Sequence, residues 1–177
     1  MRKKLTLVIL LSAATAITVI CARKALATPS SGFTATTLAK GTLGEFDVFN
    51  YFIPPDSNGE KCDRNVWLSL QKTKGSSDLY VQSNVWQPGG NTGWHSHPGH
   101  SLIIVTEGSV TNYESDAPDC KPQVYTKGMG FVDGGGDHVH NVRNESDVVA
   151  KTIAVQLIPA GAKRRIDAAK PDNCPSF

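Results

Sequence analysis

All five histidines of the chain lie in two short windows. His95, His97 and His100 stand in the segment GWHSHPGHS, and His138 and His140 stand in GDHVHNVRN. Each window contains a His-x-His pair in a stretch with a strand-like pattern, and side chains two residues apart on a strand point to the same face. Imidazole nitrogens are common metal ligands. The two pairs therefore offer up to four nitrogen ligands to one metal ion.

Strands are predicted throughout the chain after Thr28. Short apolar or alternating runs are separated by Gly, Pro, Asn and Asp, which is typical of an all-β protein. Their regular spacing favours a sandwich or small barrel, and the length of 177 residues fits a single domain. The stretch 160–170 is the one helix-like segment, although it contains Gly161. The predicted strands are 33–39, 45–52, 66–71, 78–86, 93–97, 101–107, 109–113, 123–125, 130–133, 138–144 and 149–157.

The first 27 residues have the pattern of an export signal. A basic start is followed by the uncharged apolar stretch 5–22 and by Ala25-Leu26-Ala27, which fits a cleavage site. We therefore predict a signal peptide over 1–27 and a mature domain over 28–177 that is exported to the periplasm or secreted. The alternative is an uncleaved membrane anchor formed by residues 5–22, because 18 uncharged residues are long for a signal core.

The charge of the mature domain argues against nucleic acid as a partner. The whole chain carries +2, but five of its 18 basic residues lie in or beside the signal. The 13 that remain stand against 16 acidic residues, so the mature domain carries about −3. We expect contact with a membrane only through the N-terminal segment, if that segment is not cleaved.

Three cysteines remain once the signal is removed, namely Cys62, Cys120 and Cys174. Disulfides form readily in proteins that are exported to an oxidising compartment. We predict a bond between Cys120, in a turn-rich stretch, and Cys174, in the C-terminal tail 159–177, and leave the partner of Cys62 open. Closing that loop would stabilise the fold by about 4 kcal/mol in the chain-entropy model.

Polar side chains on two predicted strands suggest a ligand cavity. Tyr80, Gln82 and Asn84 share one face of 78–86, and Gln156 lies on the polar face of 149–157. The alternative is that the first face is exposed at a sheet edge. The residues predicted to form a substrate pocket are Tyr80, Gln82, Asn84, Trp94, Ser101 and Gln156.

The first histidine window resembles the first motif of the cupin superfamily, G-x5-H-x-H-x3,4-E-x6-G. Gly89, His95, His97 and Gly108 reproduce its spacing, and Ser101 stands where the motif has glutamate. A serine hydroxyl is a poorer ligand for a divalent cation than a carboxylate.

The second window resembles the second cupin motif, G-x5-P-x-G-x2-H-x3-N. Gly128, His140 and Asn144 follow this motif with one extra residue, and Gly134 replaces its proline. His138 competes with His140 for the ligand position, since both share one strand face. The resemblance spans about residues 78–158 and implies a double-stranded β-helix, the cupin jelly-roll barrel.

The resemblance implies a metal site inside the barrel. It assigns His95, His97 and His140 as ligands, with His100 or His138 as candidates for a fourth position. The implied cofactor is a divalent transition metal, such as Fe, Mn, Zn, Ni or Cu. Asp133 and Asp137 flank the glycines 134–136; each is either an acid, base or orienting partner at the barrel mouth, or a turn residue.

Three functions are compatible with this pattern. The first is a metal-dependent enzyme that acts on a small organic molecule, with oxygenase-type chemistry favoured. The second is a non-catalytic cupin that binds a small ligand or a metal. The third is a metal-free structural or interaction barrel. Cupins are often dimers, so the resemblance also suggests a homodimer.

Overall fold

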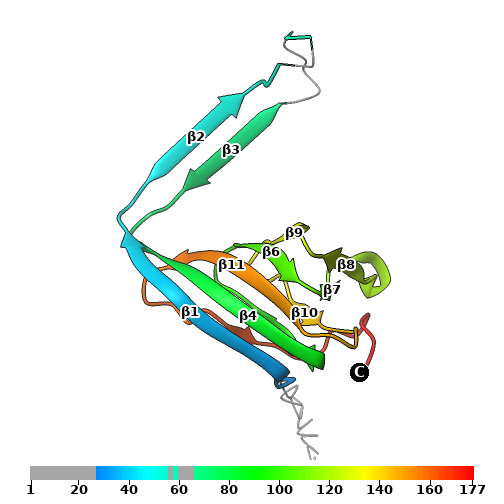
Figure 1. The fold of residues 1–177 in the computed structure, drawn as a ribbon. Helices are drawn as coiled ribbons and strands as arrows, with labels where there is room; N and C mark the ends of the chain where they lie inside the picture. Colours follow the sequence, from blue (N-terminus) through cyan, green and yellow to red (C-terminus); the bar gives the residue numbers. More distant parts are fainter. Residues whose placement is uncertain (1–26, 56–57, 60–65) are drawn as a thin grey trace, which may run out of the picture.

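The structure is a computed structural model, and it describes residues 27–55, 58–59 and 66–177. This part of the chain is built from strands and one short 3-10 turn, η2 (Pro118–Cys120) (Figure 1). The strands are β1 (Ser31–Leu43), β2 (Asp47–Phe52), β3 (Trp67–Lys72), β4 (Ser77–Asn91), β5 (His95–Ser96), β6 (Ser101–Glu107), β7 (Ser109–Glu114), β8 (Gln123–Thr126), β9 (Gly130–Asp133), β10 (His140–Arg143), β11 (Ala150–Pro159) and β12 (Ile166–Asp167). The predicted all-β class is confirmed.

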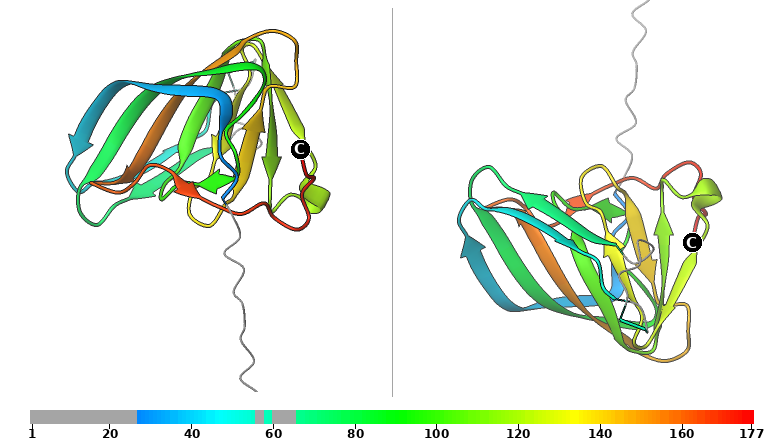
Figure 2. Two further views of the ribbon diagram at one scale, coloured as in Figure 1. Left: turned by 90° about the horizontal axis from the view of Figure 1, so that it is seen from below. Right: turned by 90° about the horizontal axis from the view of Figure 1, so that it is seen from above.

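Ten of the strands form one antiparallel sheet that curls into a barrel (Figure 2). One wall follows the order β1-β4-β11-β6-β9, and the other follows β8-β7-β10-β5-β12. The walls are joined by the pair Arg143 and Asn91 between β10 and β4. Along β11, buried and partly buried residues alternate from Ala150 to Ile158, so every second side chain points into the barrel.

Each strand predicted from the sequence has a counterpart, but the helix-like expectation for 160–170 is wrong. Gly161 has a φ of +77°, which a right-handed helix does not accept. Ile166 then pairs with Ser96 as part of β12, and the amide of Ala168 donates to the carbonyl of Trp94. Pairing with the barrel therefore decides the conformation of this segment.

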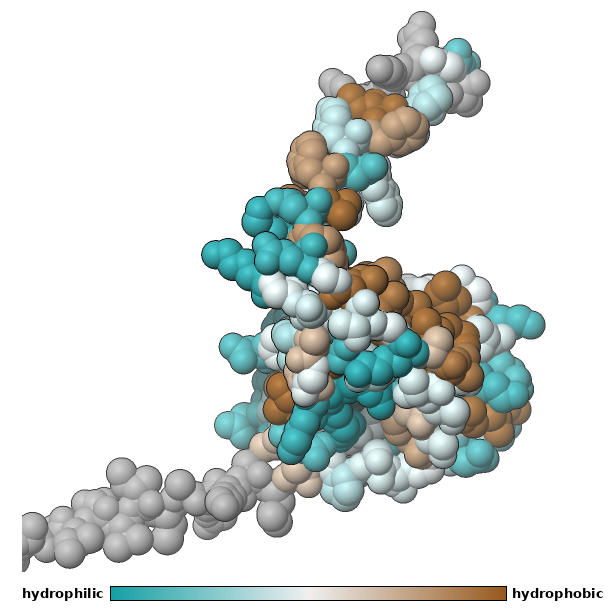
Figure 3. Space-filling view, turned by 90° about the vertical axis from the view of Figure 1, so that its left-hand side faces the viewer, coloured by the Kyte–Doolittle hydropathy of each residue, from teal (hydrophilic) through white to brown (hydrophobic). Residues whose placement is uncertain are grey.

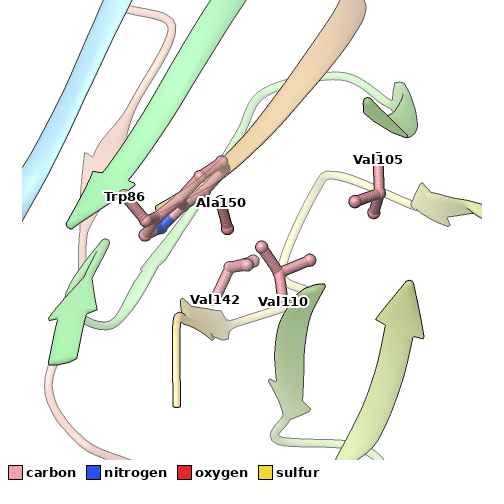
Figure 4. Packing of buried hydrophobic residues seen from close by; sticks show 5 residues of the cluster. All are labelled: Trp86, Val105, Val110, Val142 and Ala150. Atoms are coloured by element: carbon pink, nitrogen blue, oxygen red, sulfur yellow. The ribbon is translucent and has the colours of Figure 1, made fainter. Parts of the chain in front are cut away.

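A hydrophobic cluster joins the two walls of the barrel. Trp86, Val105, Val110, Val142 and Ala150 are each at most 5% exposed and come from five strands that belong to both walls (Figure 4). Burial of each large apolar side chain contributes about 1.5–3 kcal/mol. This cluster holds the walls together from the inside.

The predicted disulfide is confirmed. Cys120 and Cys174 are bonded, 54 residues apart in the sequence. Both lie in a second buried cluster with Trp94 and Tyr113. The bond therefore fixes the C-terminal tail to the barrel.

Some predictions fall on residues outside the described ranges. The signal peptide 1–27, apart from Ala27, the alternative anchor 5–22 and Cys62 all lie there. Among the residues that the structure describes, no helix is long and apolar enough to cross a membrane.

Replacing both bonded cysteines, as Cys120→Ser/Cys174→Ser, should lower the free energy of unfolding by about 4 kcal/mol, because the unfolded chain is no longer restricted by the cross-link. Urea denaturation in oxidising buffer measures this loss. The parent chain should lose the same amount when it is reduced. A variant as stable as the oxidised parent would contradict a stabilising role for the bond.

Candidate metal centre

Three of the five histidines meet inside the barrel. His95 on β5 is directly opposite His140 on β10, and His97 follows β5 on the same face as His95. Their ring centroids are 4.3 Å apart for His95 and His140, and 4.8 Å apart for His95 and His97. One nitrogen from each ring lies within 4.8 Å of the other two, so the three can share one metal ion.

Close backbone contact brings the two histidine windows together. The amide of Gly136 donates to the carbonyl of His97 at 2.7 Å. Gly135 has a φ of +70°, and a Cβ atom there would lie 2.4 Å from the backbone of Gly99. Only glycine fits this position, because both the conformation and the space exclude a side chain.

Backbone carbonyls orient two of the imidazole rings. His95 Nδ1 lies 2.8 Å from the carbonyl of Gly93, and His97 Nδ1 is hydrogen-bonded to the carbonyl of Arg164. A carbonyl can only accept, so each neutral ring carries its proton on Nδ1 and keeps a lone pair on Nε2. Metal-binding histidines are commonly oriented by such a bond from their second nitrogen.

Burial keeps the three rings neutral. It lowers the pKa of His95 and of His140 well below the ordinary value, and neighbouring histidines add to the effect. Burial also lowers the pKa of His97, although its bond to the Arg164 carbonyl partly opposes the shift. A neutral imidazole is the form that binds metal.

A carboxylate that the motif comparison did not assign as a ligand also reaches the cluster. Asp133 on β9 is 3% exposed and is paired in register with Ser101 of β6. Its Oδ2 lies 3.5 Å from His97 Nε2, and its Oδ1 lies 3.5 Å from His140 Nδ1. Ser101 Oγ donates to Oδ2 at 3.5 Å, and the amide of Gly135 donates to Oδ1 at 3.0 Å.

The 3.5 Å between Asp133 Oδ2 and His97 Nε2 fits two ligands of one metal ion better than it fits a direct hydrogen bond. Two ligands of a tetrahedral ion with bonds of about 2.1 Å are about 3.4 Å apart, close to the observed separation of their ligand atoms. The sequence offered one signal for Asp133, its position beside the glycine turn. Only the pairing with Ser101 shows that it reaches the place of the missing glutamate.

Four of the six predicted pocket residues line the cavity that contains this cluster, namely Gln82, Asn84, Ser101 and Gln156. Arg164 and Arg165 line it as well. Several buried polar atoms in the cavity wall have no hydrogen-bond partner within the described part of the chain. These atoms are Gln82 Nε2, Gln156 Oε1 and His140 Nδ1. Buried polar atoms usually have partners, so the cavity wall offers unpaired hydrogen-bonding groups to its interior.

The other two predicted pocket residues do not line this cavity. The Tyr80 ring lies outside it, with Lys40 Nζ 5.3 Å and the Arg164 guanidinium 5.1 Å from the ring centroid. Trp94 is 1% exposed and packs in the cluster around the disulfide.

Neither of the two candidate fourth histidines belongs to the group of three rings. His100 lines a groove on the outside of the barrel, next to Leu102 and Leu157. His138 lies closer, with its ring 5.9 Å from that of His140 and its Nδ1 paired with Asp116 at 3.0 Å. Ligand atoms of His138, His140 and Asp133 also lie within 4.8 Å of one another, so these three form a second possible ligand group that shares His140 with the first. The Pro98-Gly99 turn does not bring His100 inward.

Comparison with known proteins finds likeness in structure but none in sequence. No protein-family profile matches the chain, and no curated protein matches it. An uncharacterised conserved protein with a double-stranded β-helix domain from Klebsiella pneumoniae is 19% identical over 52% of this chain and 76% of its own, with a TM-score of 0.44. Oxalate oxidase is 18% identical over 46% of each chain, with a TM-score of 0.40.

A third solved structure covers more of the chain. The polyketide cyclase RemF from Streptomyces resistomycificus is 13% identical over 85% of this chain and 84% of its own, with a TM-score of 0.50. Likeness at this identity concerns the fold alone. The chain folds as an all-β barrel of the double-stranded β-helix type, the fold that the resemblance of its two histidine windows implied.

Proposed function

We propose that this protein binds a divalent transition metal through His95, His97 and His140, with Asp133 as the carboxylate ligand. The observation that carries the proposal is the cluster of three buried rings, two of them oriented by backbone carbonyls. The buried Asp133 compensates for the missing glutamate and balances part of the charge of the ion. Nitrogen and carboxylate ligands together suit iron, manganese, zinc, nickel or copper.

A metal bound here would supply Lewis acidity and activate a bound small molecule. Around it, the amides of Gln82, Asn84 and Gln156 offer hydrogen bonds to a polar ligand. Arg164 and Arg165 add positive charge to the cavity wall. This lining favours a small organic molecule with an anionic group, such as a carboxylate.

The favoured activity is an oxygenase-type reaction on that molecule, and the alternative is binding without turnover. Oxygen uptake by the metal-loaded protein, measured with a panel of small carboxylic acids, distinguishes the two. Tight binding without oxygen uptake or product would favour the binding protein.

We also infer that the protein acts outside the cytoplasm. The buried disulfide between Cys120 and Cys174 is typical of an oxidising compartment. The basic and apolar segment at the start of the sequence supports export. Mass spectrometry of the exported protein tests whether it begins at Thr28.

The purified protein should contain close to one metal ion per chain. The variant His95→Ala/His97→Ala/His140→Ala should contain none, because it lacks all three nitrogen ligands. Inductively coupled plasma mass spectrometry on untagged protein measures both. His100→Ala is the matched control, since His100 lies on the outside of the barrel, and it should keep the metal. Metal absent from the parent, even after incubation with divalent ions, would contradict the proposal.

Asp133→Asn should weaken metal binding by about 10-fold to 100-fold, because the amide keeps the size of the side chain but not its charge. Competition with a chelator measures the change in affinity. Asp137→Asn is the control, since Asp137 is exposed in the same turn, and its affinity should match that of the parent. Equal affinities for all three proteins would show that Asp133 is not a ligand.

The metal-free protein should lose stability as the pH falls below about 6.5. The pKa values of His95 and His140 are held well below that of an unfolded histidine. In this range the unfolded chain therefore binds more protons than the folded chain, and acidification favours unfolding. Urea denaturation of chelator-treated protein across this pH range measures the slope. His95→Gln/His140→Gln should show a shallower slope, and an unchanged slope would contradict the assignment to these two rings.

A further inference from the structure

A two-stranded arm extends away from the barrel (Figure 1). It is formed by β2 and β3, which continue from the end of β1 and lead into the start of β4. In this hairpin, Phe49 is paired with Leu70, and Tyr51 is paired with Leu68. Paired residues, and residues two apart on one strand, share a face. These four residues therefore form one apolar face of the arm.

The apolar face of the arm lies open to solvent. Its four side chains are 56–71% exposed. On the opposite face, the polar pair of Asn50 and Ser69 lies between Val48 and the pair of Phe52 and Trp67, which are themselves 47–63% exposed. An isolated two-stranded hairpin is only marginally stable in water, and large exposed apolar patches mark interaction surfaces. The arm therefore exposes apolar side chains on both faces, as expected of a surface that a partner covers.

The barrel carries a second exposed apolar surface. On β6, Ile103 and Val105 point inward, whereas Leu102 and Ile104 point outward and are 52% and 56% exposed. Val132 of β9 is paired with Leu102 and is 59% exposed. We call the outward side chains of Leu102, Ile104 and Val132 the outer face. Figure 3 shows apolar surface gathered on the barrel near the base of the arm.

A groove connects the arm to the outer face. Leu43, Phe46 and Val48 line it from the side of the arm, and Leu102 and Leu157 line it from the barrel. Hydrogen bonds join the two strands of the arm at its base. The amide of Thr73 donates to the carbonyl of Phe46 at 2.9 Å, and Phe46 donates back to Thr73 Oγ1 at 3.1 Å.

Asp78 at the start of β4 also fixes this base. It accepts hydrogen bonds from the amide of Gly161 at 3.0 Å and from Thr42 Oγ1 at 2.8 Å, and it pairs with Lys40 Nζ at 3.0 Å. These three partners lower its pKa to about 2. The bonds tie the end of β1 to β4 and to the turn after β11, so the arm leaves the barrel from a rigid support.

We propose that two copies of this chain exchange arms, so that the apolar face of each arm covers the outer face of the other barrel. Both halves of the contact are present on one chain, which is the condition for a twofold symmetric dimer. Within one chain, the apolar face of the arm and the outer face both stay more than half exposed, so the arm does not cover its own barrel. A second copy is therefore the occupant that covers both surfaces at once.

The size of the surfaces supports this occupant. A large apolar side chain has a surface of about 150–250 Å². Multiplied by the observed exposed fractions, the four arm residues and the three residues of the outer face can together bury roughly 800 Å² per chain. A stable interface of standard size buries about 800 Å² per partner. The exchange thus reaches the area that a lasting dimer needs, whereas the arm alone would not.

Sedimentation velocity of the purified chain should show a dimer. Leu70→Asp on the arm and Ile104→Asp on the outer face should each give a monomer, because each buries an unpaired charge in the contact. Ser69→Asp is the matched control, since Ser69 is next to Leu70 but faces the other way, and it should remain dimeric. Circular dichroism checks that the monomeric variants are folded. A parent that is monomeric at its highest soluble concentration would overturn the proposal, as would a dimer that survives both substitutions.

Cysteine cross-linking distinguishes exchange from an arm that folds back on its own barrel. In a Cys62→Ser background, a chain with Leu70→Cys is mixed with a differently tagged chain with Leu102→Cys. Exchange predicts a disulfide between the two tags. A chain that carries both substitutions and forms the bond only within itself, as a monomer, would overturn the exchange.

Discussion

The alternation of side chains along the strands is the constraint on which both the core and the metal centre depend. A shift of one residue in the register of a strand moves all of its side chains to the opposite face. Pairing of His95 with His140 sets the register between β5 and β10. Pairing of Ser101 with Asp133 does the same for β6 and β9. The hydrogen bonds that close the barrel therefore also bring the imidazoles and the carboxylate together.

The interior of the barrel is polar at the cost of stability. Gln82, Asn84, Thr152 and Gln156 are all buried, although amide and hydroxyl groups lose hydration when they leave water. Some of their atoms lack partners in the described part of the chain. An apolar filling would stabilise the barrel more, so these side chains are explained better by a ligand than by folding. Stability comes instead from the cluster around Trp86 and from the disulfide.

The outside of the chain shows the reverse pattern, with apolar side chains on the arm and on the outer face of β6 and β9. A solitary barrel in water gains nothing from this arrangement. Exchange of arms between two copies would remove both surfaces from water, and it would leave the metal-binding cavity inside each barrel. In that arrangement, assembly and metal binding use different faces of the same strands, so each can be altered without the other.

The amino-acid sequence alone predicted the all-β class, the approximate position of every described strand except β12, the bonded cysteines and the three histidines that meet. These features follow from alternation and local spacing, which a chain carries without its neighbours. Other features became visible only in the folded chain. The fold shows that Asp133 on β9 reaches His97 and His140, that Trp94 packs around the disulfide, that His100 faces outward, and that 160–170 is not helical. Each of these features depends on which strands lie side by side. Local sequence patterns do not predict the pairing of strands that are far apart in the sequence.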